Sequence, residues 1–137
     1  MDYENGTYVG LFAINNGTIK NLSVVIDDIG GNQYVGAIAG RNSGTISNVT
    51  VTQNSAFSTG KGVTGYSAPG SSDNNYSYAG GIAGFNNADA VIEHCFVNVC
   101  VNGYYFIGGI TGANKGTIRE CAFTGGVNHV VNKTKGI

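Results

Sequence analysis

The sequence predicts an all-β fold, a right-handed parallel β-helix (solenoid) of about four coils with one long inserted loop. Three observations lead to this prediction. A glycine-rich unit recurs with a period near 27 residues, which is typical of solenoids. Apolar residues then alternate with period two, as in strands. The chain also has 23 glycines against one proline and only 11% charged residues, which favours strands and turns over helices. The right-handed sense is expected by analogy with parallel crossover connections.

The repeat is defined by two anchors. "GRNSGTISNV" (residues 40–49) and "GANKGTIREC" (residues 112–121) are nearly the same unit, and the isoleucine anchors are Ile19, Ile46, Ile92 and Ile118. Upstream anchors precede an asparagine by four residues at Leu11/Asn15, Ile38/Asn42, Ile82/Asn86 and Ile110/Asn114. We therefore expect one repeat domain, 1–137, with repeats near 7–33, 34–52, 78–103 and 106–131 and an inserted loop at 53–77.

Aligned positions of the copies form columns. Three residues after the isoleucine anchors stand Leu22, Val49, Cys95 and Cys121, and two residues further on stand Val24, Val51, Val97 and Phe123. If the copies stack in parallel at about 4.8 Å, each apolar column becomes part of the core. The asparagines are expected to form a hydrogen-bonded ladder. Glycines 40, 84 and 112, and 17, 44 and 116, are expected at corners that need a positive φ or close backbone approach.

The inserted loop is the place where recognition is expected. The 44-residue spacing between Ile38 and Ile82 exceeds the normal repeat, and insertions of this kind in solenoids often bind partners. Four tyrosines in or near inter-coil connections could present flat amphipathic faces to a carbohydrate or protein ligand. They are Tyr66, Tyr76, Tyr104 and Tyr105. The alternative is that these rings pack against the coil and shield an edge.

The unit resembles the GLUG motif, a glycine-rich repeat with the approximate pattern Gly-Gly-Leu-Val-Gly-x-Asn-x-Gly-Thr-Ile. The resemblance lies at residues 9–19, 36–46, 80–92 and 108–118. It implies a module of large bacterial surface or secreted proteins, including adhesin-like ones, and an extracellular or cell-surface location. The family carries no catalytic residues to transfer. The expected function is therefore a non-enzymatic structural or adhesion module that spaces or presents binding surfaces.

The rival function is a polysaccharide-active or carbohydrate-binding β-helix. Glycosidic cleavage needs paired acids, and only Glu93 and Glu120 are expected near one corner on neighbouring coils. A calcium ion on Asp27, Asp28 and Asn32 is an open alternative to a polar turn. No catalytic residue, cofactor site or metal site is otherwise predicted.

The histidines and cysteines give little support to an enzyme. His94 and His129 lack the spacing of a zinc peptidase motif. His94 is expected to face solvent and to point away from Cys95, because neighbours on a strand face opposite sides. Cys95 and Cys121 are expected as a buried pair, and Cys100 as an exposed thiol on the outward phase of "VNVCVN".

Charge and hydropathy limit the partners. A formal net charge of −1 without basic runs gives no footprint for nucleic acid, and no apolar stretch is long enough for membrane insertion. Expected partners are a host or cell-wall glycan or protein, and neighbouring domains of the same polypeptide. Ile137 lies 27 residues after Ile110, where the next unit would begin. The chain is therefore expected to be part of a longer array that can associate end to end.

Overall fold

The computed structural model describes residues 2–3, 7–57, 61–66 and 76–129, and its regular elements there are all strands. The first sheet contains β1 (Asp2–Tyr3), β5 (Asp28–Gly31), β9 (Gly62–Gly65), β14 (Cys100–Gly103) and β19 (Gly126–His129), in that order. The second contains β2 (Tyr8–Val9), β6 (Tyr34–Gly36), β10 (Tyr78–Gly80) and β15 (Phe106–Gly108). The described residues contain no helix long and apolar enough to cross a membrane.

The other two sheets complete the circuit of the chain. The third contains β3 (Phe12–Asn15), β7 (Ala39–Asn42), β11 (Ala83–Asn86) and β16 (Thr111–Asn114). The fourth contains the long strands β4 (Thr18–Ile26) and β8 (Thr45–Gln53), followed by shorter strands. These are β12 (Val91–Glu93), β13 (Phe96–Asn98), β17 (Thr117–Arg119) and β18 (Ala122–Phe123).

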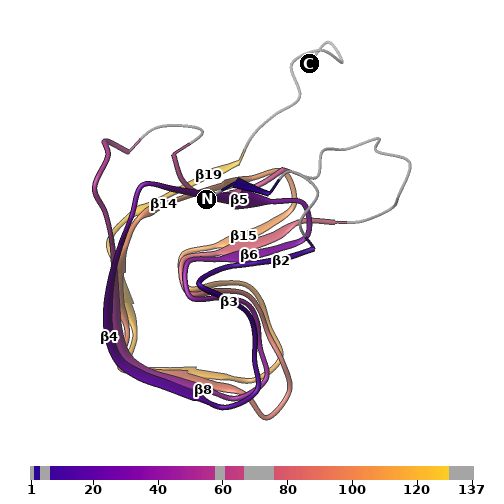
Figure 1. Cartoon of the computed structure of the whole chain (residues 1–137), viewed down its shortest axis with the longest axis vertical. Coiled ribbons are helices and arrows are strands. Elements are labelled where there is room, and N and C mark those ends of the chain that lie inside the picture. The colour runs from indigo at the N-terminus through magenta and orange to yellow at the C-terminus, as the bar shows by residue number, and fades with distance from the viewer. Residues whose placement is uncertain (1, 4–6, 58–60, 67–75, 130–137) are drawn as a thin grey trace.

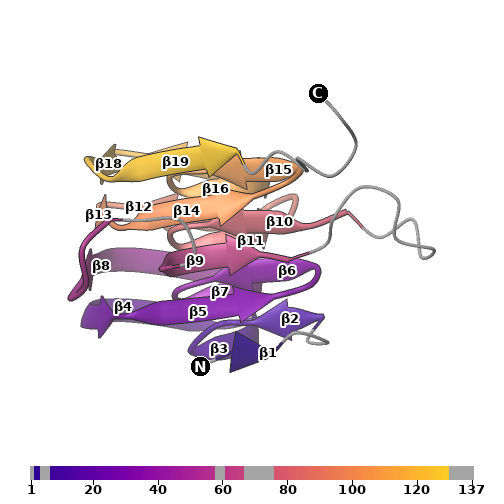
Figure 2. The same cartoon turned by 90° about the horizontal axis from the view of Figure 1, so that it is seen from above.

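Every strand pair given for the described residues is parallel and joins equivalent positions of neighbouring copies. Ile46 pairs with Ile19 on one side and with Ile92 on the other, and Ile92 pairs with Ile118. Viewed along the stack, the copies superimpose on one outline (Figure 1), and from the side they form layers that run from the N-terminal to the C-terminal copy (Figure 2). The predicted all-β architecture with parallel stacking, consistent with a β-solenoid, is confirmed.

The core is made of the predicted columns. Ile46, Val49 and Val51 on β8 and Ile92 and Val97 on the next copy are fully buried. The residues between them, such as Ser47, Asn48 and Thr50, are partly or largely exposed. Each fully buried isoleucine or valine contributes about 1.5–3 kcal/mol through the apolar area that it removes from water. The alternation of period two therefore places the apolar face of the fourth sheet inward.

The four asparagines form the predicted ladder. Asn15 Nδ2 donates to Asn42 Oδ1 at 2.8 Å, Asn42 Nδ2 to Asn86 Oδ1 at 2.9 Å, and Asn86 Nδ2 to Asn114 Oδ1 at 2.8 Å. Each amide also bonds its own turn, as where Asn42 Nδ2 donates to the Gly44 carbonyl and Asn42 Oδ1 accepts from the Gly44 amide. Asn42 and Asn86 are fully buried, so the ladder supplies the partners that buried amides require.

The glycines act mainly through close backbone approach. A Cβ on Gly40 would lie 2.8 Å from the Val9 nitrogen, and one on Gly112 would lie 2.6 Å from the Ala79 nitrogen. These glycines allow the backbones of the second and third sheets to approach closely. The chain reverses direction there, between β6 and β7, and the cross-section of the stack is indented (Figure 1). At Gly17, in contrast, a Cβ would meet nothing within 4 Å, so no packing constraint requires glycine there.

The positive φ angles lie elsewhere than expected. Among the described glycines only Gly62 has φ in the left-handed region, at 90°. Apart from Asp89, with φ 65°, left-handed turns are instead made by one column of the repeat, in which Asn21, Asn48, His94 and Glu120 have φ between 51° and 58°. Asparagine tolerates this conformation better than most residues because its short side chain bonds locally. The bend at this column separates β12 from β13 and β17 from β18.

The predicted inserted loop at 53–77 is interrupted by a strand. β9 pairs with β5 on one side and β14 on the other, so Val63 is fully buried between Ile29 and Val101. The unusual spacing therefore comes from longer connections on both sides of an ordinary layer strand. Residues 58–60 and 67–75 of the expected loop lie outside the described residues. Removing 53–75 would delete β9, the middle strand of the first sheet, and is therefore expected to disrupt the fold.

The inward column can be tested with a charge. Ile46→Asp should unfold the domain, because it places a carboxylate in a fully buried position and removes an apolar contact to both neighbouring copies. Ser47→Asp is the matched control, since Ser47 is the next residue and is partly exposed. Far-UV circular dichroism and thermal melting measure the effect. An Ile46→Asp protein that melts within a few degrees of the Ser47→Asp protein would contradict the assignment.

The left-handed column gives a stabilising prediction. His94→Asn together with Glu120→Asn should raise the free energy of unfolding by about 0.5–1 kcal/mol, because asparagine relieves left-handed strain at two sites. The cost is the exposed His94–Glu120 ion pair, which is replaced by the amide contact seen between Asn48 and Asn21. Chemical denaturation measures the change. Ser47→Asn, at an extended position, should give no gain, and a destabilised double variant would refute the interpretation.

Candidate functional site

One column of the repeat places aromatic rings on the side of the molecule. Tyr8, Tyr34, Tyr78 and Phe106 are the first residues of β2, β6, β10 and β15, and the pairing register sets them directly opposite one another. Their ring centroids are 5.0, 5.1 and 4.8 Å apart, and adjacent planes differ by 7–9°. This spacing is close to the distance between neighbouring strands of about 4.8 Å, so the backbone itself holds the rings in a stack.

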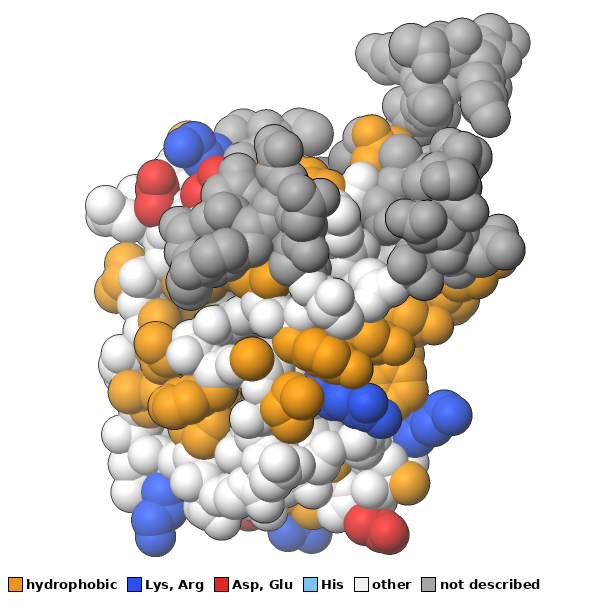
Figure 3. Space-filling view, turned by 45° about the vertical axis from the view of Figure 1, so that its right-hand side comes forward, with side chains coloured by type: hydrophobic (Ala, Val, Ile, Leu, Met, Phe, Trp, Pro, Cys, Tyr) orange, Lys and Arg blue, Asp and Glu red, His pale blue; other side chains and the backbone are white. Residues whose placement is uncertain are grey.

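A second column faces this stack. Phe85 on β11 lies edge-on to Tyr34 and Tyr78, with centroid distances of 5.9 and 5.6 Å. The Arg41 guanidinium and the Lys115 ammonium each lie 5.8 Å from the centre of the Phe85 ring. Figure 3 brings this side forward and shows hydrophobic side chains bordered by Lys and Arg side chains. The result is an aromatic surface with two cations at its margin.

Two of the four predicted tyrosines extend the surface. The Tyr76 ring lies edge-on to Tyr105 at 4.7 Å and to Phe106 at 6.0 Å. Tyr76 and Phe106 have about half of their area exposed, 48% and 47%. We call the set Tyr8, Tyr34, Tyr76, Tyr78, Phe85, Tyr105 and Phe106 the aromatic surface.

The other two predicted tyrosines have different roles. A Cβ on Gly30 would lie 2.5 Å from Tyr66 Cε2, so the Tyr66 ring packs over β5. For Tyr66 the structure thus agrees with the alternative interpretation, in which the ring packs against the coil. At Tyr104 the backbone makes the contact, since its carbonyl oxygen lies 2.9 Å from His129 Nε2.

Partial burial changes the chemistry of the central ring. Burial and the neighbouring Tyr78 and Tyr8 raise the pKa of Tyr34, while Arg41 opposes them. The Tyr34 hydroxyl is therefore protonated throughout the physiological pH range and can donate a hydrogen bond. Arg41 is itself fixed, because its Nε donates to Asn87 Oδ1 at 2.9 Å. The surface thus offers ring edges, hydroxyl donors and an oriented cation.

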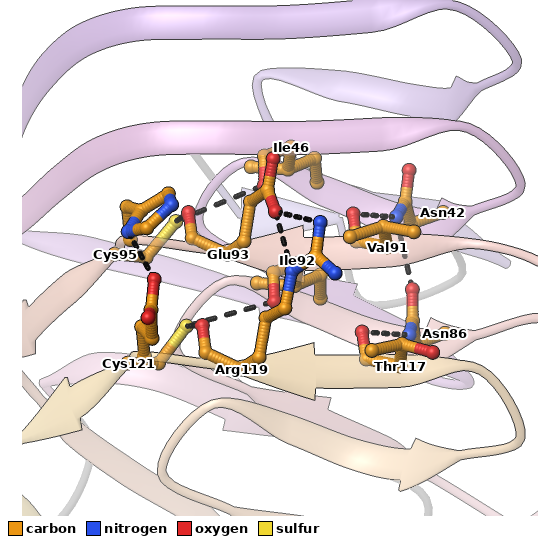
Figure 4. A network of polar contacts seen from close by, with 12 residues as sticks. Asn42, Ile46, Asn86, Val91, Ile92, Glu93, Cys95, Thr117, Arg119 and Cys121 are labelled. Carbon is orange, nitrogen blue, oxygen red and sulfur yellow. Dashed lines mark hydrogen bonds and ion pairs between the residues drawn. The ribbon is translucent and has the colours of Figure 1, made fainter.

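The acids expected near one corner are each paired with a base. Arg119 Nε donates to Glu93 Oε2 at 2.6 Å, and this contact lowers the pKa of Glu93 (Figure 4). His94 Nδ1 lies 2.8 Å from Glu120 Oε2, with both side chains more than half exposed. Glu93 therefore forms an ion pair with Arg119, and Glu120 a separate contact with His94, each across neighbouring copies. As predicted, His94 faces solvent while Cys95 faces the core.

The residues considered as calcium ligands do not form a cluster of acids. Asp27 lies 3.6 Å from the Lys61 ammonium, and its side chain is 59% exposed. Across the described residues, no group of three or more His, Cys, Asp and Glu side chains is placed to hold a metal ion. Asp27, between β4 and β5, thus forms a surface ion pair with Lys61, directly before β9.

The thiols differ from one another in their surroundings. Cys95 and Cys121 lie one above the other in the inward column, as predicted, but only Cys95 is buried. Cys121 is partly exposed, because it belongs to the last copy and is covered on one side alone. Burial raises the pKa of Cys95 to about 11 (Figure 4). The prediction of an exposed Cys100 is wrong. The Cys100 side chain does point to the face of β14 opposite that of Val101, as its position in the strand predicts. It is nevertheless fully buried, and its Sγ lies 2.9 Å from Asn128 Nδ2. The Asn102 side chain on the same face donates to the Lys61 carbonyl, directly before β9.

Comparison with known proteins supports the repeat assignment. A family model described as the GLUG motif matches residues 31–54, which contain β6, β7 and β8. The chain contains a GLUG motif. The match covers the second copy of the unit, in which the Asn42 amide and the buried Ile46 lie. No curated protein and no solved structure matches the chain.

The aromatic stack was not predicted from the sequence as a site, although a signal was present. An aromatic residue begins the unit in "YVGAIAG", "YAGGIAG" and "YFIGGITG". In the last copy the ring that joins the stack is Phe106, the second residue of "YFIGGITG", because the pairing register places it opposite Tyr78. The preceding Tyr105 then contacts Tyr76 instead.

Thiol reactivity gives a test of these surroundings. Native protein at pH 8 should react quickly at Cys121 and slowly at Cys95 and Cys100, because burial raises the pKa of both slow thiols. With a pKa of about 11, only about one thousandth of Cys95 is thiolate at that pH. Alkylation followed by peptide mass spectrometry assigns each rate. All three thiols should react alike in denaturant, and rapid native labelling of Cys100 would contradict the burial.

Proposed function

We propose that this chain is a non-enzymatic structural or adhesion module of a bacterial surface or secreted protein. In this proposal it is a right-handed β-solenoid of about four coils that spaces or presents binding surfaces outside the cell. The observation that carries the proposal is the use of repeated side chains between copies. The isoleucine column packs in the core, and the asparagine column bonds amide to amide. Residues that recur in every unit therefore serve cohesion.

The surface charges support a role without catalysis. Glycosidic cleavage requires two carboxyl groups about 5–10 Å apart that are free to act on one bond. Glu93 is bound to Arg119, and Glu120 is bound to His94. Such pairs join neighbouring copies across the surface of the fourth sheet. These contacts favour a role in holding neighbouring copies together over a role in catalysis.

The GLUG motif supports the extracellular part of the proposal. Resemblance to this motif implies the repeat regions of bacterial surface and secreted proteins, and the family match at residues 31–54 strengthens the resemblance. A rigid stack also suits the role of a spacer. Each unit would add one strand spacing of about 4.8 Å to the length, with no change in the lateral surface.

A second candidate is a carbohydrate-binding β-helix, and the aromatic surface is the observation that favours it. Sugars pack their C–H faces against exposed rings, and Tyr76 and Phe106 expose about half of their area. Arg41 and Lys115 lie beside Phe85, so an acidic polysaccharide would gain charge-assisted contacts. The inner rings of the stack offer only edges, because their faces contact one another.

The two candidates are tested together on the purified chain. Polygalacturonate, hyaluronan and a neutral β-glucan serve as probes, with release of reducing ends as the measure of cleavage and calorimetry as the measure of binding. We expect no cleavage. If the acidic probes bind, Tyr76→Ala should weaken Kd by about 2–12-fold, which corresponds to 0.5–1.5 kcal/mol for one ring contact.

Two controls make the outcome specific. Phe57→Ala removes a ring of similar exposure, 47%, that has no contact with the aromatic surface among the described residues. It should leave binding unchanged. Cleavage that is lost on Glu93→Gln or Glu120→Gln, with the melting temperature maintained, would overturn the non-enzymatic proposal. Absence of binding to any probe would remove the support for the carbohydrate-binding candidate and leave the spacer role.

A further inference from the structure

Three phenol hydroxyls form a row on the side of the stack. Tyr8, Tyr34 and Tyr78 share one column, and neighbouring rings lie 5.0 and 5.1 Å apart with planes that differ by 9° and 7°. Because the rings are nearly parallel and in register, their hydroxyls recur at about the strand spacing of 4.8 Å. That separation is too long for one hydroxyl to bond the next. Each hydroxyl therefore needs a partner from outside the row.

These hydroxyls are accessible and have no partner inside the described part of the chain. They make no hydrogen bond with any described residue, and their oxygen atoms are not buried. Tyr34 and Tyr78 belong to the second and third copies, with a described copy on either side, and both side chains are partly exposed. Their exposed area therefore faces sideways and does not depend on what lies beyond the first or the last copy. The row is thus a set of free donors and acceptors on the lateral surface.

Two cations that lack an acidic partner border the row. Arg41 and Lys115 each lie 5.8 Å from the centre of the Phe85 ring, which is edge-on to two rings of the row. Neither cation takes part in an ion pair with a described residue. In the space-filling view, basic side chains border the hydrophobic ones on this side of the molecule (Figure 3). The aromatic surface therefore has positive charge that the described residues do not neutralise.

The Arg41 guanidinium is held with its outer end free. Its Nε donates to Asn87 Oδ1 at 2.9 Å, and Asn87 Nδ2 donates to Ser43 Oγ. The two terminal nitrogens of Arg41 make no hydrogen bond to any residue that the structure describes. Paired N–H groups of this kind bind a carboxylate through two parallel hydrogen bonds. Burial raises the pKa of Tyr34 while the nearby Arg41 charge lowers it, so the cation and the phenol lie close enough to contact one ligand.

These features together indicate the chemistry of a ligand. A row of hydroxyls with one member per copy matches a linear polymer that carries hydroxyl groups on every unit, as a glycan does. The unpaired guanidinium matches a carboxylate on that polymer. Sugar rings also present C–H faces to the half-exposed rings of Tyr76 and Phe106. An acidic peptide supplies the carboxylate but neither the repeated hydroxyls nor the C–H faces, so the observations favour a carboxylated glycan.

We propose that the aromatic surface binds a linear glycan with carboxylated sugars, a polyuronate, and that this glycan lies along the stack. The hydroxyls of Tyr8, Tyr34 and Tyr78 bond the hydroxyls of successive sugar units. Arg41 binds one carboxylate through its two terminal nitrogens, and Lys115 attracts the negative charge of the chain from the other side of Phe85. This inference rests on the carbohydrate-binding candidate, and it adds the direction of the ligand and the residue that selects its charge.

Two forms of one probe separate the charge of the ligand from its sugar. They are a galacturonate oligomer and the same oligomer with methyl-esterified carboxyl groups, and calorimetry on the purified chain measures the Kd of each. The acid should bind about tenfold more tightly than the ester, because only the acid forms charge-assisted hydrogen bonds with Arg41. Added NaCl should weaken the binding of the acid and leave that of the ester unchanged. This comparison uses the wild-type protein and is independent of how any variant folds.

The selecting cation is tested with a matched pair of variants. Arg41→Gln should weaken the Kd of the acid by about tenfold and leave that of the ester unchanged, because it removes the charge and the paired N–H groups. Lys20→Gln is the control, since Lys20 is another cation without an ion pair among the described residues but lies on the fourth sheet. It should leave both affinities unchanged. Thermal melting verifies that each variant is folded.

The row of hydroxyls and the direction of the ligand are tested separately. Tyr34→Phe keeps the ring in the stack and removes one hydroxyl, so both probes should bind about threefold more weakly. Affinity should also rise from a galacturonate dimer to an oligomer that reaches three copies, because each added unit meets another hydroxyl. A dimer that binds as tightly as longer oligomers would contradict an orientation along the stack.

Three results overturn the inference. They are equal affinities for acid and ester, a folded Arg41→Gln protein that binds the acid as wild type does, and poly-L-glutamate that binds as tightly as the galacturonate oligomer with the same dependence on Arg41. If the ester binds through Tyr76 and the carboxylate adds nothing, this inference fails and the carbohydrate-binding candidate stands. If neither probe binds, both fail, and the spacer role is unaffected.

Discussion

Parallel pairing of equivalent residues between neighbouring copies is the constraint on which the rest of the structure depends. Because the strands pair equivalent positions of neighbouring copies, each side chain lies about 4.8 Å from the side chain at the same position of the next copy. Apolar side chains satisfy this rule easily, as the isoleucine column does. A buried polar side chain satisfies it only when it both donates and accepts. Asparagine meets that requirement, so the Asn42–Asn86 contact is possible where two buried aspartates would repel each other.

The same constraint orders the surface. Rings that share a column must stack, so Tyr8, Tyr34, Tyr78 and Phe106 have adjacent planes within 9° of parallel and cover one another's faces. Like charges directly opposite each other would be destabilising, and the acids at this corner instead contact basic residues, Glu93 with Arg119 and Glu120 with His94. Where the side chain must also occupy a left-handed turn, two copies use asparagine and two use residues less suited to it. These two residues, His94 and Glu120, contact each other across neighbouring copies.

The sequence could predict the columns because the cause lies within the repeat. The inward isoleucines, the asparagine ladder and the Cys95–Cys121 pair all follow from period-two alternation and a fixed spacing. β9 was missed because its residues are set between two unusually long connections and carry no anchor, so their pairing with β5 and β14 depends on tertiary contacts. Cys100 was assigned the right phase but the wrong exposure, because the covering segment near Lys61 is remote in sequence. The left-handed column was hidden because His94 and Glu120 are not residues that usually mark such turns.

A stack built this way divides its surface into parts with different uses. Its layers meet through apolar, amide and aromatic groups, each of which contacts the equivalent group of the next layer. Its sides are corners and outward columns, where a side chain can change without loss of the core, as the series Ser23, Thr50, Phe96 and Ala122 demonstrates. Cohesion therefore depends on the contacts between layers. The aromatic surface with Arg41 and Lys115 lies on a side, so a ligand bound there would leave the contacts between layers unchanged.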